Sequence, residues 1–319
     1  MLNRSTDNVV LPTETIIITS DLLVAMTIEH VLHMAKGGGE TSYAKNSWLQ
    51  RRALLETTPL LDKAVREVYM ALSHPTMTIC DLGCSSSENT LFFVSKVIEA
   101  MCSHRRELGA STKFLDGLEG NPNEGNIYIA KNTPPYVVKL YQELFQKDFL
   151  LFLKLRYEEL VFGGQMLLIF LGRKNEDAYS GELNLVYGLL AKSIQFLVEE
   201  GLVGKEKLDS FNLPIYGPSV DEVKMVVKQS ELFDINKIEL FEHNWDPYDY
   251  SKSDHVDDPL QSGMNVAKCL RAVMEPLFGR HFGESVLDAL FDKYAHNVAE
   301  HLEREKTKYS IIVLSLKKG

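Results

Sequence analysis

The chain has 319 residues, of which 45% are hydrophobic and 24% are charged, proportions that are ordinary for a globular protein. Its formal net charge of −10 argues against nucleic acid or an anionic membrane as a partner, because either would need a basic surface. The four cysteines form no Cys-x-x-Cys pair, so we expect reduced thiols in a cytoplasmic protein rather than disulfides or a zinc site.

The N-terminal segment, residues 1–25, contains only short apolar runs such as Thr15–Thr19. These runs are too short for a membrane helix, and the segment lacks the basic start of a signal peptide. A more regular pattern begins at Met26, so the native start is either Met1 or Met26. We predict that residues 1–25 are a disordered extension and that residues 26–319 form a single domain.

Hydrophobic periodicity, together with glycine and proline positions, predicts an alternation of helices and strands. The predicted helices begin near Ser42 and cover 42–55, 60–72, 88–104, 134–162, 183–200, 219–229, 263–278 and 284–306. The predicted strands cover 77–81, 125–130, 165–171, 233–245 and 309–316. This alternation predicts an α/β fold, and the late helices predict a mostly helical cap at about 200–305.

One segment, Met77–Thr90, carries a recognisable ligand-binding pattern and reads MTICDLGCSSSENT. A strand that ends in Asp-x-Gly and leads into a helix can hold a nucleotide-like cofactor, and Gly83 lets the backbone approach it closely. The segment lacks the glycine patterns of dinucleotide folds and of P-loops, so S-adenosylmethionine suits it better than NAD or ATP. The same turn also occurs as plain structure, without any ligand.

Several separated segments share a resemblance to one family. They read LHM…GGGETSYAKNSWLQ, DLGCSSSENT, GNIYIAK, FQKDFLLFLKLRYEELVFGGQML, EEGLV and DSFNLPIYGPS. Together they resemble the plant SABATH family over roughly residues 29–319. That family consists of S-adenosylmethionine-dependent methyltransferases that act on small carboxylic acids, such as salicylate, benzoate and anthranilate, or on xanthine alkaloid nitrogens. The resemblance implies a Rossmann-like methyltransferase sheet and a homodimer.

The resemblance also implies three groups of site residues. Contacts to S-adenosylmethionine would come from Tyr43, Asp81, Gly83, Cys84 and Asn89. The acceptor carboxylate would face Gln50, and Tyr187 is a second candidate for the acceptor wall. A magnesium ion would be bound by Asn123, Asp209, the backbone carbonyl of Phe211, and Asn212. Oxygen ligands of these kinds suit a hard cation.

Each of these assignments has a purely structural alternative. Tyr43 and Gln50 lie seven residues apart, so they could simply pack on one face of a helix. Cys84 could be a small core residue, and Tyr187 could equally be core packing. The Asp and Asn side chains of the magnesium set could cap a helix end, as such side chains often do.

The chain departs from the family after the motif helix. Only residues 91–126 separate Thr90 from the next family segment at Ile127, which is about enough for one helix and a loop. A βα crossover takes roughly 30 residues, so we estimate that two or three units, on the order of 60–80 residues, are missing between 108 and 123. This interval would hold the family's ribose-binding acid and much of its acceptor wall.

The predicted reaction is transfer of a methyl group from S-adenosylmethionine to the carboxylate of a small aromatic acid, giving a methyl ester. The acceptor is already ionised at neutral pH, so alignment of the reactants suffices and no catalytic base is expected. The alternative is a catalytically inactive homologue that acts as a dimer partner or has no independent function. A missing strand would leave its neighbours unpaired unless the motif strand paired directly with Gln165–Leu171.

Overall fold

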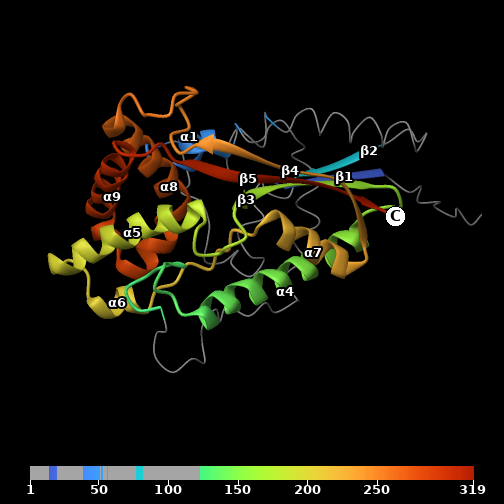
Figure 1. The fold of residues 1–319 in the computed structure, drawn as a ribbon, viewed down its shortest axis with the longest axis horizontal. Coiled ribbons are helices and arrows are strands. Elements are labelled where there is room, and N and C mark those ends of the chain that lie inside the picture. The colour runs from blue at the N-terminus through green and yellow to red at the C-terminus, as the bar shows by residue number, and fades with distance from the viewer. Residues whose placement is uncertain (1–13, 20–38, 51, 53–55, 57–76, 82–122) are drawn as a thin grey trace, which may run out of the picture.

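The computed structural model describes residues 14–19, 39–50, 52, 56, 77–81 and 123–319. The predicted helices at 60–72 and 88–104 lie outside the described residues, as do the three motif residues Gly83, Cys84 and Asn89. Within the described part, one sheet is flanked by helices along a face and by a helical region at one end (Figure 1).

The sheet has five strands in the order β2-β1-β3-β5-β4. In chain order the strands are β1 (Glu14–Thr19), β2 (Met77–Asp81), β3 (Gln165–Gly172), β4 (Phe233–Asn244) and β5 (Lys308–Lys318). Strands β2, β1 and β3 run parallel, whereas β5 is antiparallel to both β3 and β4. Helices joined to a mixed sheet with three adjacent parallel strands confirm the predicted α/β class.

Strand β1 is the second strand of the sheet and lies between the motif strand β2 and the central strand β3. Ile18 is in register with Asp81 on one side and with Leu167 on the other. Direct pairing of the motif strand with Gln165–Leu171 was therefore wrong. Six residues of the segment expected to be a disordered extension form this strand, and its run of three isoleucines is typical of strands.

Two helices, α4 (Pro135–Glu159) and α7 (Val220–Ser230), cover one face of the sheet (Figure 1). Pro135 starts α4 at a position where its missing N–H costs no hydrogen bond. Their apolar faces bury a core with the inner strands, and this core includes Phe149, Leu153, Met166, Leu168, Val223, Val226, Ile312 and Leu314. This layer packs on β3 and β5, and β3 leads to the candidate site.

The remaining helices gather at the end of the sheet toward which β3 runs (Figure 1). They are α1 (Tyr43–Asn46), α5 (Glu182–Glu199), α6 (Lys205–Asp209), α8 (Pro259–Phe282), the 3-10 turn η3 (Glu284–Val286) and α9 (Leu287–Leu302). The interval assigned to the helical cap, 200–305, also contains α7 and β4, which belong to the sheet layers. No helix in the described part of the chain is long and apolar enough to span a membrane.

The predicted strand at 125–130 was wrong, because residues 123–134 form a loop. Its three central residues, Ile127, Tyr128 and Ile129, are nonetheless buried. The Leu213 backbone N–H donates to the Ile127 carbonyl at 2.7 Å, and the Asn184 amide donates to the Ile129 carbonyl at 2.9 Å. A loop that is buried in an apolar core needs large apolar residues just as a strand does, so the sequence pattern did not distinguish the two.

Candidate functional site

The candidate site lies at the carboxyl ends of the parallel strands, where open α/β sheets bind ligands. Strand β2 ends at Asp81, the residue predicted to organise the cofactor turn, and β3 ends at Gly172. Strand β4 runs in the same direction as β3, so the loop that follows Asn244 reaches the same end of the sheet. Helix α1 lies near this end, beside α8 (Figure 1).

A cluster of four side chains attaches the segment that carries Tyr43 and Gln50 to the loop after β4. None of the four was predicted as a site residue from the sequence. The Trp48 cluster consists of Trp48, Arg52, Tyr248 and Tyr250. The Trp48 indole N–H donates to the Tyr250 hydroxyl at 2.7 Å, and its ring stacks with Tyr248 at a centroid distance of 6.4 Å. The Arg52 guanidinium lies 4.7 Å from the centre of the Tyr250 ring, where a cation–π attraction operates.

The loop that receives this segment is itself fixed by a buried ion pair. The Lys306 ammonium lies 2.7 Å from the Asp249 carboxylate, and the Lys306 side chain is only 4% exposed. Burial would raise the pKa of Asp249, but hydrogen bonds from Lys306 and Ser251 outweigh it and hold that pKa below its usual value. The Asn244 amide also donates to the Asp249 carbonyl at 2.9 Å. These contacts hold the loop after β4 in one conformation, and this loop in turn packs against the segment around Gln50.

Gln50 lies in this segment, and the oxygen of its side-chain amide has an unusual environment. Its Oε1 atom is buried and has no hydrogen-bond partner within the described part of the chain. A buried polar atom without a partner costs free energy, so a ligand that donates a hydrogen bond here gains affinity. Tyr43, at the start of α1, is 2% exposed, and the packing alternative for this residue stays open.

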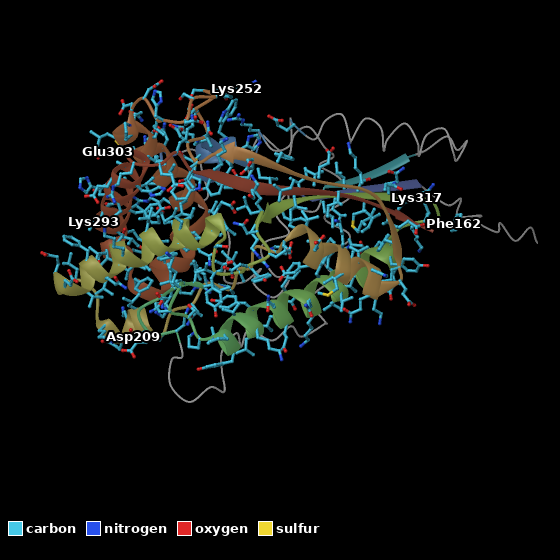
Figure 2. The ribbon with its side chains drawn as sticks, viewed as in Figure 1. Phe162, Asp209, Lys252, Lys293, Glu303 and Lys317 are labelled. Carbon is cyan, nitrogen blue, oxygen red and sulfur yellow. The ribbon has the colours of Figure 1, made fainter. Side chains whose placement is uncertain are left out.

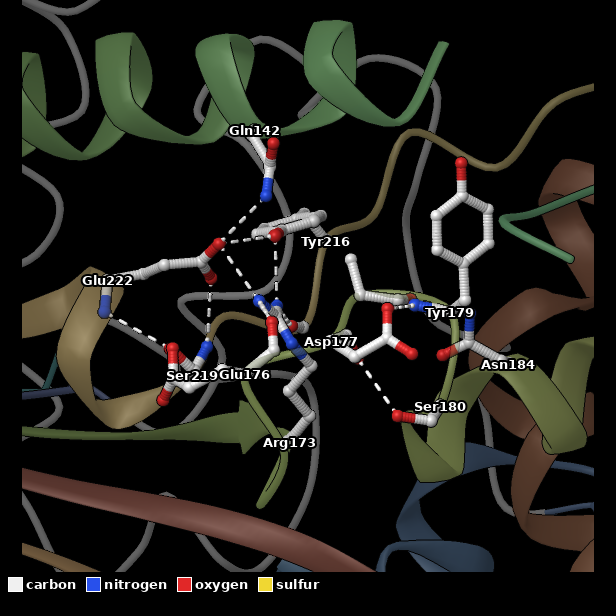
Figure 3. A network of polar contacts seen from close by, with 12 residues as sticks. Gln142, Arg173, Glu176, Asp177, Tyr179, Ser180, Asn184, Tyr216, Ser219 and Glu222 are labelled. Atoms are coloured by element: carbon white, nitrogen blue, oxygen red, sulfur yellow. Dashed lines mark hydrogen bonds and ion pairs between the residues drawn. The ribbon is translucent and has the colours of Figure 1, made fainter. Parts of the chain in front are cut away.

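A second polar network, drawn in Figure 3, fixes the end of β3. Arg173 is 3% exposed, and its guanidinium donates to the Tyr216 hydroxyl at 2.9 Å and pairs with the Glu222 carboxylate at 2.9 Å. Glu222 also accepts from the Gln142 amide at 3.1 Å and from the Ser219 backbone N–H at 2.9 Å. These bonds join β3 to α4, to α7 and to the loop before α7. The sequence reading named none of them.

Tyr187, the second acceptor-wall candidate, lies in α5 and is 4% exposed. Its ring packs edge-to-face on Tyr128 at 5.2 Å, and Tyr128 packs in the same way on Tyr141 at 5.7 Å. Burial raises the pKa of Tyr187 above its usual value, and burial raises the pKa of Tyr128 to about 12. These contacts fit the core-packing alternative, and the acceptor-wall role stays a prediction.

The predicted magnesium ligands are brought together near α6. The Asn123 amide donates to the Asn212 side-chain oxygen at 2.9 Å, and the Gly125 backbone N–H donates to Asp209 at 3.2 Å. Phe211 is buried, with its ring 5.0 Å from that of Phe278. Figure 2 shows Asp209 at the margin of the helical region, away from the strands.

These residues do not fit a divalent cation. The described residues contain no group of three or more His, Cys, Asp or Glu side chains that could hold a metal. The amide and carboxylate oxygens of the predicted ligands accept hydrogen bonds from protein groups instead. The expectation of Mg²⁺ therefore finds no support here.

A model of the family described as "SAM dependent carboxyl methyltransferase" matches residues 29–118 and 113–319. The chain belongs to this family. Anthranilate O-methyltransferase 3 of Zea mays is 46% identical over 373 aligned positions, which cover 92% of this chain and 98% of that relative. The benzoate O-methyltransferase of Zea mays is 42% identical and covers 92% of this chain and 100% of that relative.

The length of these alignments confirms the internal deletion. An alignment of 373 positions exceeds the whole chain of 319 residues, so the relatives contain residues that this methyltransferase lacks. A solved structure of loganic acid methyltransferase with SAH has a TM-score of 0.70 at 24% identity, covering 89% of this chain and 98% of that chain. The methyltransferase fold is therefore retained despite the deletion.

Proposed function

We propose that this methyltransferase transfers a methyl group from S-adenosylmethionine to the carboxylate of a small aromatic acid and releases a methyl ester. The observation that carries the proposal is the family match on both sides of the deletion, with relatives named for anthranilate and benzoate at 46% and 42% identity. S-adenosylmethionine supplies a methyl group on a positively charged sulfur. The part of its site within the described residues fits, because Asp81 ends a parallel strand at the ligand-binding edge.

The chain's own contribution is alignment rather than proton transfer. A benzoate-type carboxylate is ionised at neutral pH, so it attacks the methyl carbon without a general base. The Gln50 amide has a nitrogen that can donate to the carboxylate and a buried oxygen that has no partner among the described residues. The Trp48 cluster fixes the backbone on either side of Gln50, so the acceptor is held in one orientation.

The unpaired oxygen of Gln50 favours one kind of aromatic acid. Anthranilate has an amine next to its carboxylate, and salicylate has a hydroxyl there, so each can donate to Oε1 while its carboxylate accepts from the amide nitrogen. Benzoate has no such donor and would leave Oε1 without a partner. We therefore propose an ortho-substituted benzoic acid as the acceptor.

The test is a calorimetric titration of the purified protein with S-adenosylmethionine, followed by methyl-transfer assays with anthranilate, salicylate and benzoate. Saturable cofactor binding and ester formation with an ortho-substituted acid support the proposal. A well-folded protein that binds no S-adenosylmethionine refutes it.

The alternative is a catalytically inactive member that acts by association. The deletion favours it, and one relative at 44% identity is named an inactive anthranilate O-methyltransferase of Zea mays. Co-purification with a full-length family member, together with absent cofactor binding, would support this alternative. A homodimer in the cytoplasm remains part of the proposal, and light scattering after gel filtration measures the oligomeric state.

A further inference from the structure

The hydrogen bonds around Asn123 leave its side chain unavailable to a cation. Its amide nitrogen donates to the Tyr128 carbonyl at 3.1 Å, and since a carbonyl can only accept, this contact fixes which side of the amide carries nitrogen. The same nitrogen donates to Asn212 at 2.9 Å. The amide oxygen then faces the Thr133 hydroxyl, which donates to it at 2.7 Å, and Asn123 as a whole is 1% exposed.

The two carboxylates beside Asn123 share one ammonium from the chain itself. The Lys205 ammonium donates to Glu124 at 2.5 Å and forms an ion pair with Asp209. The other oxygen of Asp209 accepts from the Gly125 backbone N–H at 3.2 Å. One cationic group thus bridges the loop at 123–126 and the last residue of α6.

Other bonds hold the same loop in place without a metal. The Gln195 amide of α5 donates to the Gly125 carbonyl at 2.8 Å, and Gly125 has a positive φ of 78°, which glycine adopts without strain. The Leu213 backbone N–H donates to the Ile127 carbonyl at 2.7 Å. The loop therefore has hydrogen-bonding partners on α5, on α6 and on the segment after α6.

We propose that Lys205 is the resident cation of this site and takes the place of a divalent metal, so that the join between the 123–126 loop and α6 is independent of Mg²⁺. Mg²⁺ needs near-ideal octahedral oxygen geometry and gives up its water reluctantly. To bind here it would have to displace the Lys205 ammonium from two carboxylates and turn the Asn123 oxygen away from Thr133. This proposal concerns the binding of a cation and the stability of the fold, so it stands apart from the proposed methyl transfer.

The test compares the full-length chain with the variant Lys205→Met, which keeps the aliphatic stem and removes the charge. Each is titrated with MgCl₂ by calorimetry and followed by thermal unfolding. We expect the wild type to show no binding and no change in Tm at millimolar Mg²⁺. Lys205→Met should bind Mg²⁺ about tenfold or more tightly than the upper limit that the wild-type titration sets, the size expected from removing one unit charge beside a divalent ion in water.

Lys207→Met is the matched control, because Lys207 lies on the same helix and its ammonium bonds to the Phe282 carbonyl rather than to a carboxylate. We expect this control to gain no Mg²⁺ affinity. Wild-type Mg²⁺ binding that is lost in Asp209→Asn would overturn the proposal. A Lys205→Met variant that gains no affinity would refute the assignment of Lys205 as the group that excludes the metal. If that variant does not fold, the wild-type and Asp209→Asn titrations still decide the question.

Discussion

Removal of the N-terminal strand is the perturbation for which the structure gives the clearest expectation. A chain that begins at Met26 lacks β1, so β2 and β3 lose the strand between them. Five residue pairs link β1 to β2, and four link it to β3. If each pair corresponds to about one backbone hydrogen bond of 0.5–1.5 kcal/mol net, the loss is on the order of 4–14 kcal/mol.

This loss is as large as the whole stability of an ordinary domain, which is about 5–15 kcal/mol. Re-pairing of β2 with β3 would recover only part of it, and would require β2 and the elements attached to it to move by one strand spacing of about 4.8 Å. We therefore expect the truncated chain to be insoluble or to lack a cooperative unfolding transition. Circular dichroism and urea unfolding measure this directly.

Two further variants separate the effect of losing β1 from the effect of shortening the chain. A chain that begins at Glu14 keeps β1 and should unfold like the wild type. Ile17→Pro removes one backbone N–H in the middle of β1, where Ile17 pairs with Cys80 and Met166, and proline is not tolerated in a central strand. A chain that begins at Met26 and unfolds at the wild-type urea midpoint would show that β1 contributes nothing, and would refute the reasoning.

Three other expectations concern the site and its supports. Glu222→Ala leaves the buried Arg173 guanidinium without its carboxylate and should lower the free energy of unfolding by about 3–5 kcal/mol in urea titrations, with part recovered in the double variant Arg173→Met/Glu222→Leu. Gln50→Leu should lower kcat/KM for anthranilate by about 10–100-fold, as expected for loss of a hydrogen bond to a charged group, without lowering the urea midpoint; an unchanged kcat/KM excludes Gln50 from the acceptor site. Burial, aided by the charge of Arg52, lowers the pKa of His243, so the unfolded chain binds a proton more readily than the folded chain. The free energy of unfolding should therefore be greatest above about pH 6.5 and should fall as the pH drops toward the folded pKa of His243. The fall should be less steep in His243→Gln. An equally steep fall in that variant would rule out His243 as a source of the pH dependence.

Strand prediction succeeded for β2, β3, β4 and β5, but it missed β1 and placed a strand in the loop at 125–130. The runs at Gln165–Gly172 and Lys308–Lys318 are nearly continuous and buried, as central strands require. Strand β1 is six residues long, and its apolar run of three isoleucines looks the same as a short apolar stretch in a loose terminus. What makes it a strand is pairing with residues about 60 and 150 positions away, and no local pattern encodes that pairing.

The site was only partly predictable for the same reason. The segment around Gln50 was found through resemblance, but the Trp48 cluster that fixes it joins residues about 200 positions apart. Near α6 the resemblance grouped residues that the structure also brings together, but their hydrogen bonds give no support to the Mg²⁺ that it assigned to them. Lys205 lies four residues before Asp209 on one helix, a spacing at which opposite charges meet, so this ion pair could have been expected from the sequence.

The position of β1 determines how activity measurements on this methyltransferase should be interpreted. The family model begins at residue 29, so β1, the strand between β2 and β3, comes from a segment outside both matched regions. That strand pairs with β2, whose last residue, Asp81, begins the predicted cofactor turn. A chain that begins at Met26 should therefore lose folding and cofactor binding together, so a loss of activity in that chain says nothing about the acceptor site. We expect variants at Gln50 to act on the proposed acceptor site alone, because the Trp48 cluster and the Asp249–Lys306 pair hold the surrounding backbone independently of the Gln50 side chain. Cofactor titration of the intact chain, followed by Gln50→Leu, separates loss of the fold from loss of the acceptor contact.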